Sequence, residues 1–515
     1  MAPTRIRGRQ TVMDDRRTSG ILLHPTSLPG RGIGELGASA ERFIDWLARA
    51  GQQRWQIMPL GPTGYGDSPY ASLSALAGNP LLIALDRLVE AGLLQPADLE
   101  RAPALPDDHV DFGAVIGWKM NVLQRAYANF RAGAAPAQQA AFEAFLSQHQ
   151  SWLEDYALFM ALKEAHGGAP WNQWNAALVR RDPAALAQAR ERLAERIRFQ
   201  QFLQWLFFTH WLEIKRYANQ HGVRIIGDIP IFVAYDSADV WANPELFFLD
   251  DAGNPTVVAG VPPDYFSATG QRWGNPLYRW DVLERRGYDW WIERFRLTLL
   301  LVDIVRLDHF RGFVAYWEVP AAEETAVNGR WVPGPGRALF DALRKALGRV
   351  PIIAEDLGLI TPDVHALRQE LGVPGMAVLH FAWGDTADNL YLPHNHERNL
   401  VVYTGTHDND TTVGWWHALD ERTRAHVQRY LGIHGHDIAW DLIRVALMSV
   451  AETAIIPMQD VLSLGSEARM NMPGRLGGNW SWRVRAEQLS EATAQRLADL
   501  SALYGRTPRM DGTGA

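Results

Sequence analysis

The chain has 515 residues, of which 47% are hydrophobic and 21% charged, a balance typical of a folded enzyme with a large core. Its formal net charge of −8 argues against a nucleic-acid or membrane-surface partner, and the lack of cysteine excludes disulfides, thiol catalysis and zinc–thiolate sites. The first twenty residues contain no apolar run and no later segment approaches the length of a membrane span, so we expect a cytoplasmic protein.

Apolar or β-branched runs bounded by turn residues recur along the chain. The eight runs are 21–25, 54–60, 223–233, 303–310, 350–356, 376–382, 400–410 and 453–461. Helical patterns separate most of them, as at 38–51 and 362–372. Strands that alternate with helices predict parallel pairing, and eight such units favour an α/β fold that closes into a (β/α)8 TIM barrel. An open doubly wound sheet is the alternative.

The spacing of these runs is uneven. Residues 85–215 contain long helical patterns and no convincing strand, which predicts a helical insertion subdomain between the second and third strands of a single catalytic barrel spanning 19–485. The segment 235–290 is rich in Trp, Pro, Gly and Asn and is predicted to be a long loop insertion that lines the active site. Residues 1–18 and 507–515 are predicted to be flexible termini.

Acidic residues follow five of the predicted strands. They are Asp228 after the third, Asp308 after the fourth, Glu355 and Asp356 after the fifth, Asp408 and Asp410 after the seventh, and Asp460 after the eighth. Any one of them could be a helix N-cap. Together, at the carboxyl face of a barrel, they should converge on one mouth and repel one another. Such a ring requires a cationic occupant, either a metal or the oxocarbenium-like transition state of glycoside cleavage. The 21 tryptophans mildly favour a carbohydrate ligand, although core packing explains most of them.

Metal and cofactor sites are the competing interpretations. His394-x-His396 and His407-x-x-Asp410 have ligand-like spacing, but no H-E-x-x-H element is present. Gly32 to Gly37 matches G-x-G-x-x-G, yet two prolines separate it from the preceding strand, and no acid follows the next strand to bind a ribose. We therefore expect neither a metal nor a cofactor.

The order of the strand ends resembles that of the α-amylase clan, in which Arg-x-Asp, Glu and His-Asp follow strands four, five and seven. The matching segments are 305–309, 354–356 and 406–409. Within the clan the chain resembles the 4-α-glucanotransferases, also called amylomaltases or disproportionating enzymes. The motifs that carry this resemblance span roughly residues 20–485 and are Gly64–Tyr70, Gly227–Ala234, Gly260–Phe266, Gln271–Pro276, Asp308–Gly312, Thr404–Thr411 and Arg475–Trp480.

The resemblance implies roles for particular residues. Asp308 would be the nucleophile, Glu355 the acid/base, and Asp408 would bind the sugar's 2- and 3-hydroxyls. The implied substrate-binding residues are Arg306, which would also orient Asp308, His407 beside Asp408, Tyr70 and Trp273 as stacking platforms, and Asp228, Asp264 and Asn479. Loop packing for Trp273, a turn for Asn479 and a cap for Asp228 remain alternatives.

The implied activity is transfer of α-1,4-glucan segments from a maltooligosaccharide donor to the 4-hydroxyl of an acceptor, through a covalent glucosyl-enzyme. The alternatives are hydrolysis by the same residues and a glucan-binding protein without catalysis. Intact Asp308, Glu355 and Asp408 count against the last of these.

Overall fold

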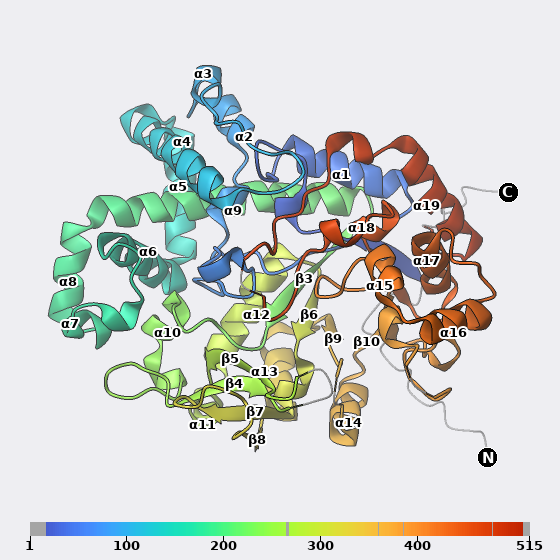
Figure 1. The fold of residues 1–515 in the computed structure, drawn as a ribbon. Helices are drawn as coiled ribbons and strands as arrows, with labels where there is room; N and C mark the ends of the chain where they lie inside the picture. Colours follow the sequence, from blue (N-terminus) through green and yellow to red (C-terminus); the bar gives the residue numbers. More distant parts are fainter. Residues whose placement is uncertain (1–16, 264–266, 359, 385, 476, 508–515) are drawn as a thin grey trace, which may run out of the picture.

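The computed structural model describes residues 17–263, 267–358, 360–384, 386–475 and 477–507. Its main sheet has eight parallel strands, hydrogen-bonded in the order β10-β11-β12-β1-β2-β3-β6-β9 (Figure 1). Their bounds are β1 Thr18–Leu22, β2 Arg54–Gln56, β3 Arg224–Pro230, β6 Ile304–Asp308, β9 Ile352–Ala354, β10 Gly375–Val378, β11 Leu400–Tyr403 and β12 Thr453–Pro457. The Ala354 N–H donates to the Pro374 carbonyl at 2.9 Å, so β9 approaches β10 and the ring nearly closes. The predicted barrel is confirmed.

Alternation along the strands separates the barrel interior from the outer layer. Ile226, Ile304 and Ile353 lie in one buried cluster, which also contains Leu22, Met376, Val401, Tyr403 and Ile455. Their neighbours Ile225 and Val305 belong to the larger core outside the barrel. Because side chains on one face of a strand recur every second residue, the same inward faces continue with polar residues toward the carboxyl ends of the strands. The alternation that places apolar side chains in the barrel interior therefore also directs the polar side chains of the site into the barrel mouth.

An outer layer of helices covers the barrel. Its members are α1 (Ala38–Arg49), α9 (Ala194–Gln220), α12 (Asp289–Leu301), α13 (Arg337–Leu347), α14 (Pro362–Leu371), α15 (Thr412–Ala418), α16 (Glu421–Leu431), α17 (Ile438–Met448), α18 (Met458–Val461) and α19 (Glu491–Leu503). Helix α19 packs against α1, and the Arg506 guanidinium donates to the Thr18 carbonyl at 2.7 Å. The folded unit therefore begins by Thr18 and continues beyond residue 485.

The segment between β2 and β3 is helical, as the sequence predicts. It contains α2 (Leu85–Glu90), α3 (Pro96–Leu99), α4 (Phe112–Gly133), α5 (Pro136–Gln148), α6 (Gln150–Ala165), α7 (Ala176–Val179) and α8 (Pro183–Arg192). Helix α9 runs from this group to the barrel (Figure 1), and its apolar side chains pack against both. Phe130, Phe142, Phe202 and Trp205 form one of its aromatic clusters, with ring centroids 5.0–6.3 Å apart. In the described part of the chain, Trp273 and Trp331 alone among the tryptophans are exposed, so core packing explains most of these residues.

A second sheet, which the sequence analysis did not predict, lies beside the barrel. Its antiparallel strands run in the order β5 (Gln271–Pro276), β4 (Val257–Val261), β7 (Ala315–Pro320) and β8 (Arg330–Pro333). Short helices α10 (Ala238–Ala242) and α11 (Trp280–Arg285) flank its first two strands along the chain. Strand β5 contains Gly and Pro, which weaken any strand signal. It is held in the sheet by pairing with β4, which in turn pairs with β7. Within the described ranges no helix is both long and apolar enough to cross a membrane.

Candidate active site

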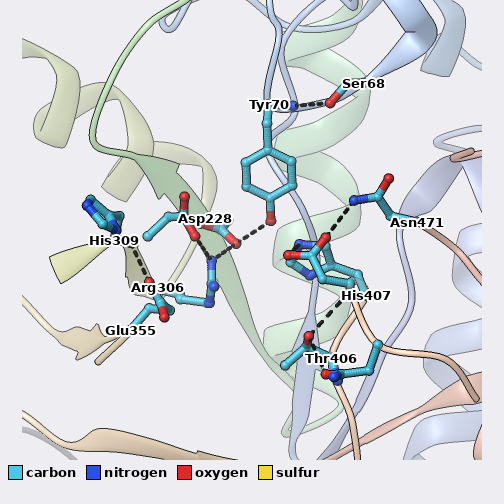
Figure 2. Close-up of polar contacts among 12 residues, drawn as sticks. Ser68, Tyr70, Asp228, Arg306, His309, Glu355, Thr406, His407 and Asn471 are labelled. Atoms are coloured by element: carbon cyan, nitrogen blue, oxygen red, sulfur yellow. Dashed lines mark hydrogen bonds and ion pairs between the residues drawn. The ribbon is translucent and has the colours of Figure 1, made fainter. Parts of the chain in front are cut away.

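Arg306 lies at the centre of the polar cluster inside the barrel mouth. It is paired in register with Asp228 on the neighbouring strand, and both point inward (Figure 2). One terminal nitrogen of Arg306 lies 2.6 Å from Asp228 Oδ2 and 3.0 Å from Asp308 Oδ1. The Tyr70 hydroxyl donates to the same Asp228 oxygen at 2.9 Å. One buried guanidinium therefore fixes two carboxylates, and Asp228 also holds Tyr70.

The environment of Asp228 differs from that of Asp308. The Asp228 side chain is 1% exposed, whereas that of Asp308 is 29% exposed. Burial raises the pKa of Asp228 and the charge of Asp308 acts in the same direction, while Arg306 opposes both. A carboxylate so enclosed has little access to a ligand. The contacts of Asp228 are those of a support for Arg306 and Tyr70, a role that the sequence did not suggest.

Glu355 lies beside Asp308 on the adjacent strand end. Leu307 is paired with Ala354, so the next residue of each strand, Asp308 and Glu355, leaves the barrel at the same level. The His309 N–H donates to one Glu355 oxygen at 2.6 Å (Figure 2). The Leu357 N–H donates to the other at 3.0 Å. His309 adopts left-handed backbone angles, with φ of 52°, and a non-glycine residue in this region is often found at functional sites.

Burial raises the pKa of Glu355 to about 8, and the charge of Asp308 adds to the effect. Arg306 and the two donated N–H groups act in the opposite direction and are outweighed. A carboxyl group with this pKa is protonated at neutral pH. Glu355 therefore has the protonation state of a general acid beside a second acid that is fixed by an arginine.

Asp408 extends from the loop after β11 and is the most open of these acids, with a side chain 47% exposed. Its Oδ1 accepts from Asn471 Nδ2 at 2.6 Å, and its Oδ2 lies 3.4 Å from His407 Nε2 (Figure 2). The His407 ring stacks on Tyr70 with centroids 5.1 Å apart and planes at 16°. Burial lowers the pKa of His407, with Arg306 adding to the effect and Asp408 opposing it. The His407 imidazole next to Asp408 is therefore neutral.

Two other predicted binding residues have different surroundings. Trp273 on β5 is exposed, and its ring meets His309 edge-on at 4.8 Å, so the second sheet brings an aromatic face to the site. The Asn479 amide binds the backbone of its own loop, accepting from the Met472 N–H at 3.0 Å and donating to the Arg475 carbonyl at 2.9 Å. Asn479 is thus a turn-forming residue in this structure. Asp264 lies outside the described residues.

The prediction that all five strand ends supply acids to the mouth is wrong for the eighth. Asp460 is fully buried and accepts from the hydroxyls of Thr404 and Thr412 at 2.5 and 2.7 Å. Asp356 turns away as well, accepting from the Met376 N–H at 2.8 Å and pairing with Arg368 at 3.1 Å. Buried N–H and O–H donors, which sequence patterns do not reveal, satisfy these carboxylates.

The histidine pair with metal-like spacing has other partners. His394 hydrogen-bonds Tyr430 at 2.6 Å, and His396 hydrogen-bonds Ser449 at 2.7 Å. Across the described ranges, no group of three or more His, Cys, Asp or Glu side chains has an arrangement that could hold a metal ion.

Three site residues were missed from the sequence. Asn471 binds Asp408, Arg469 donates to the Asp408 carbonyl at 2.7 Å, and the Trp480 ring lies 5.8 Å from Tyr70 and 5.9 Å from His407. Trp480 belongs to a motif of the resemblance, so that signal could have identified it. Asn471 and Arg469 lie about sixty residues from Asp408 in the chain, and no local pattern marks them.

Known proteins match this chain in sequence and in fold. The family described as 4-alpha-glucanotransferase matches residues 23–489. The 4-alpha-glucanotransferase of Thermus thermophilus is 54% identical, covering 94% of this chain and 98% of its own, and the chloroplastic/amyloplastic enzyme of Arabidopsis thaliana is 47% identical, covering 96% and 86%. The amylomaltase of Streptococcus agalactiae, solved in complex with acarbose, superposes with a TM-score of 0.93 at 40% identity, covering 96% of this chain and 100% of its own. The chain therefore belongs to the 4-alpha-glucanotransferase family.

Proposed function

We propose that the chain transfers α-1,4-glucan segments between maltooligosaccharides by a retaining mechanism, with Asp308 as nucleophile and Glu355 as acid/base. The observation that carries the proposal is that these two residues directly follow Leu307 and Ala354, which are paired on adjacent strands. Neighbouring strands lie about 4.8 Å apart, close to the roughly 5–5.5 Å carboxyl separation of retaining enzymes. An inverting enzyme needs a gap of about 6.5–9.5 Å to fit a water molecule.

In the first half-reaction, an Asp308 oxygen attacks the anomeric carbon of the donor sugar. Protonated Glu355 gives its proton to the glycosidic oxygen, so that bond breaks and the reducing-end portion leaves with a free 4-hydroxyl. Arg306, 3.0 Å from Asp308, orients the nucleophile through an ion pair. Asp408 stabilises the developing positive charge and binds ring hydroxyls, with neutral His407 as a further hydrogen-bonding group.

In the second half-reaction, Glu355 is ionised and acts as a base. It removes the proton from the acceptor's 4-hydroxyl, whose oxygen attacks the anomeric carbon, breaks the ester bond to Asp308 and frees the Asp308 carboxylate. Exposed Trp273 beside His309 is a platform on which an acceptor sugar can stack. Tyr70, with His407 on one ring face and its hydroxyl bound to Asp228, would contact the donor sugar with the rest of its ring.

The substrates are maltooligosaccharides and related storage glucans of the starch or glycogen type. We propose that the protein is cytoplasmic and, because its net charge is −8, that it has no nucleic-acid partner. The Arabidopsis relative is named chloroplastic/amyloplastic, so the compartment must be tested in the source cell by fractionation.

Incubation with maltotriose alone tests the reaction type. Transfer should give glucose together with maltopentaose and longer chains, while the number of reducing ends stays constant. Products resolved by chain length and a reducing-end titration on the same samples measure both quantities. A steady rise of reducing ends, with only glucose and maltose formed, would establish hydrolysis instead.

A further inference from the structure

Among the acids of the site, Asp408 most needs a neighbouring residue to fix the orientation of its side chain. It extends from a loop, its side chain is nearly half exposed, and it faces a mouth that also contains Asp308 and Glu355. Repulsion from the negative charge of Asp308 favours rotamers that turn the Asp408 carboxylate out toward solvent. In the proposed reaction, the Asp408 carboxylate must instead point toward the sugar.

We propose that Asn471 is the positioning residue that holds Asp408 in its working rotamer, an inference that rests on the proposed function. The Asn471 side-chain N–H donates to Asp408 Oδ1 at 2.6 Å, and His407 lies at the other carboxylate oxygen (Figure 2). Each Asp408 oxygen therefore has one neighbour that fixes the carboxylate plane. The lone pairs that remain are available to sugar hydroxyls.

The backbone around Asn471 is held independently of this side chain. The Asn471 N–H donates to the His407 carbonyl at 3.1 Å, and Arg469 donates to the carbonyls of Asp408 and Asn471 at 2.7 Å each. Ser466 Oγ also donates to Asp410 Oδ2 at 2.7 Å. These bonds join residues 466–471 to residues 407–410. Removing the Asn471 amide should therefore free the Asp408 side chain without releasing either loop.

The chemistry of the amide suits this task. A Lys or Arg at position 471 would also hold the carboxylate, but as an ion pair that offsets its negative charge. An amide orients the carboxylate and leaves its full charge for the cationic transition state. Arg469, the cation close by, directs its guanidinium to two backbone carbonyls. Arg469 therefore anchors the loop backbone, and Asn471 orients the Asp408 carboxylate.

Two variants and a matched control test the proposal. Asn471→Ala should lower kcat on maltotriose about 10- to 100-fold, the usual range for a hydrogen bond to a charged group, with a smaller change in KM and an unchanged melting temperature. Asn471→Asp places a second carboxylate against Asp408, so its loss should be larger and should diminish as the pH falls and that carboxylate becomes protonated. The control is Asn328→Ala, which removes a 3.0 Å hydrogen bond from the side-chain amide to Glu323 in the turn between β7 and β8; its kcat should match the parent.

A double-mutant cycle separates positioning from a general structural effect. If Asn471 acts through Asp408, Asn471→Ala should cost nothing further in an Asp408→Asn background, measured with a glycosyl fluoride donor that retains detectable turnover. An equal loss in both backgrounds, or no loss in the parent background, would overturn the inference while leaving the proposed function intact. No loss for Asp408→Asn by itself would instead contradict the role of Asp408 in the proposed function.

Discussion

Replacing Glu355 by Gln removes the proposed proton donor while nearly preserving the shape of the side chain. Burial and the charge of Asp308 raise the pKa of Glu355 to about 8. At pH 7 about ten molecules therefore carry the proton for each one that lacks it, and above pH 8 the protonated fraction falls about tenfold per pH unit. The wild-type kcat/KM on maltotriose should follow this fraction, since it reports the free enzyme.

Glu355→Gln should lower kcat/KM on maltotriose by about 10²- to 10⁴-fold, the usual contribution of general acid catalysis. Maltosyl fluoride needs no protonation of its leaving group, so the variant should still release fluoride. It should also accumulate a glycosyl adduct, because the base of the second half-reaction is missing. Fluoride release followed from pH 5 to 10 and peptide mapping by mass spectrometry measure both effects, and the adduct should map to Asp308.

The matched control is Glu397→Gln, an exposed residue before β11 and therefore at the opposite end of the barrel from the site. It should keep wild-type activity and its alkaline decline near pH 8. If Glu355→Gln retains that decline on maltotriose, another group is the acid, and the argument from burial fails. An adduct on a residue other than Asp308 would refute the assignment of the nucleophile.

Two further predictions follow from the same cluster. Arg306→Gln leaves Asp228 buried without its ion pair, so the free energy of unfolding should fall by about 3–5 kcal/mol, measured by urea denaturation. Because burial raises the pKa of that carboxyl group, the folded variant binds a proton that the unfolded chain releases, and the deficit should grow as the pH rises. Arg337→Gln, which breaks an ion pair to Asp341 in which the two side chains are 60% and 53% exposed, should cost under about 1 kcal/mol; equal losses for the two variants would contradict this account. Exhaustive chelation should leave transfer activity unchanged, because the acids are proposed to face a transient cation, and a loss restored by calcium or zinc would show that a metal occupies the site.

The sequence by itself determined the strands of the barrel and the principal acids. Apolar runs separated by helical patterns are local signals, and each of the eight predicted runs overlaps a barrel strand. Alternation within a strand placed Arg306 on the same face as Asp308, and the register of β6 with β9 then brought Glu355 beside them. The resemblance to a known family added expected roles for Tyr70 and Trp273, which the tertiary contacts place beside His407 and His309.

Only the tertiary structure decided how the site is supported. The second sheet forms by pairing of segments that lie on either side of β6, which no local pattern encodes. The bond from Tyr70 to Asp228 spans 158 positions, and that from Asn471 to Asp408 spans 63. Asp460 resembles the acids of the mouth in the sequence, yet two threonine hydroxyls hold it in the core. Hydrogen-bond partners of buried groups are set by which distant segments meet in the fold, and a pattern read along one chain does not contain that information.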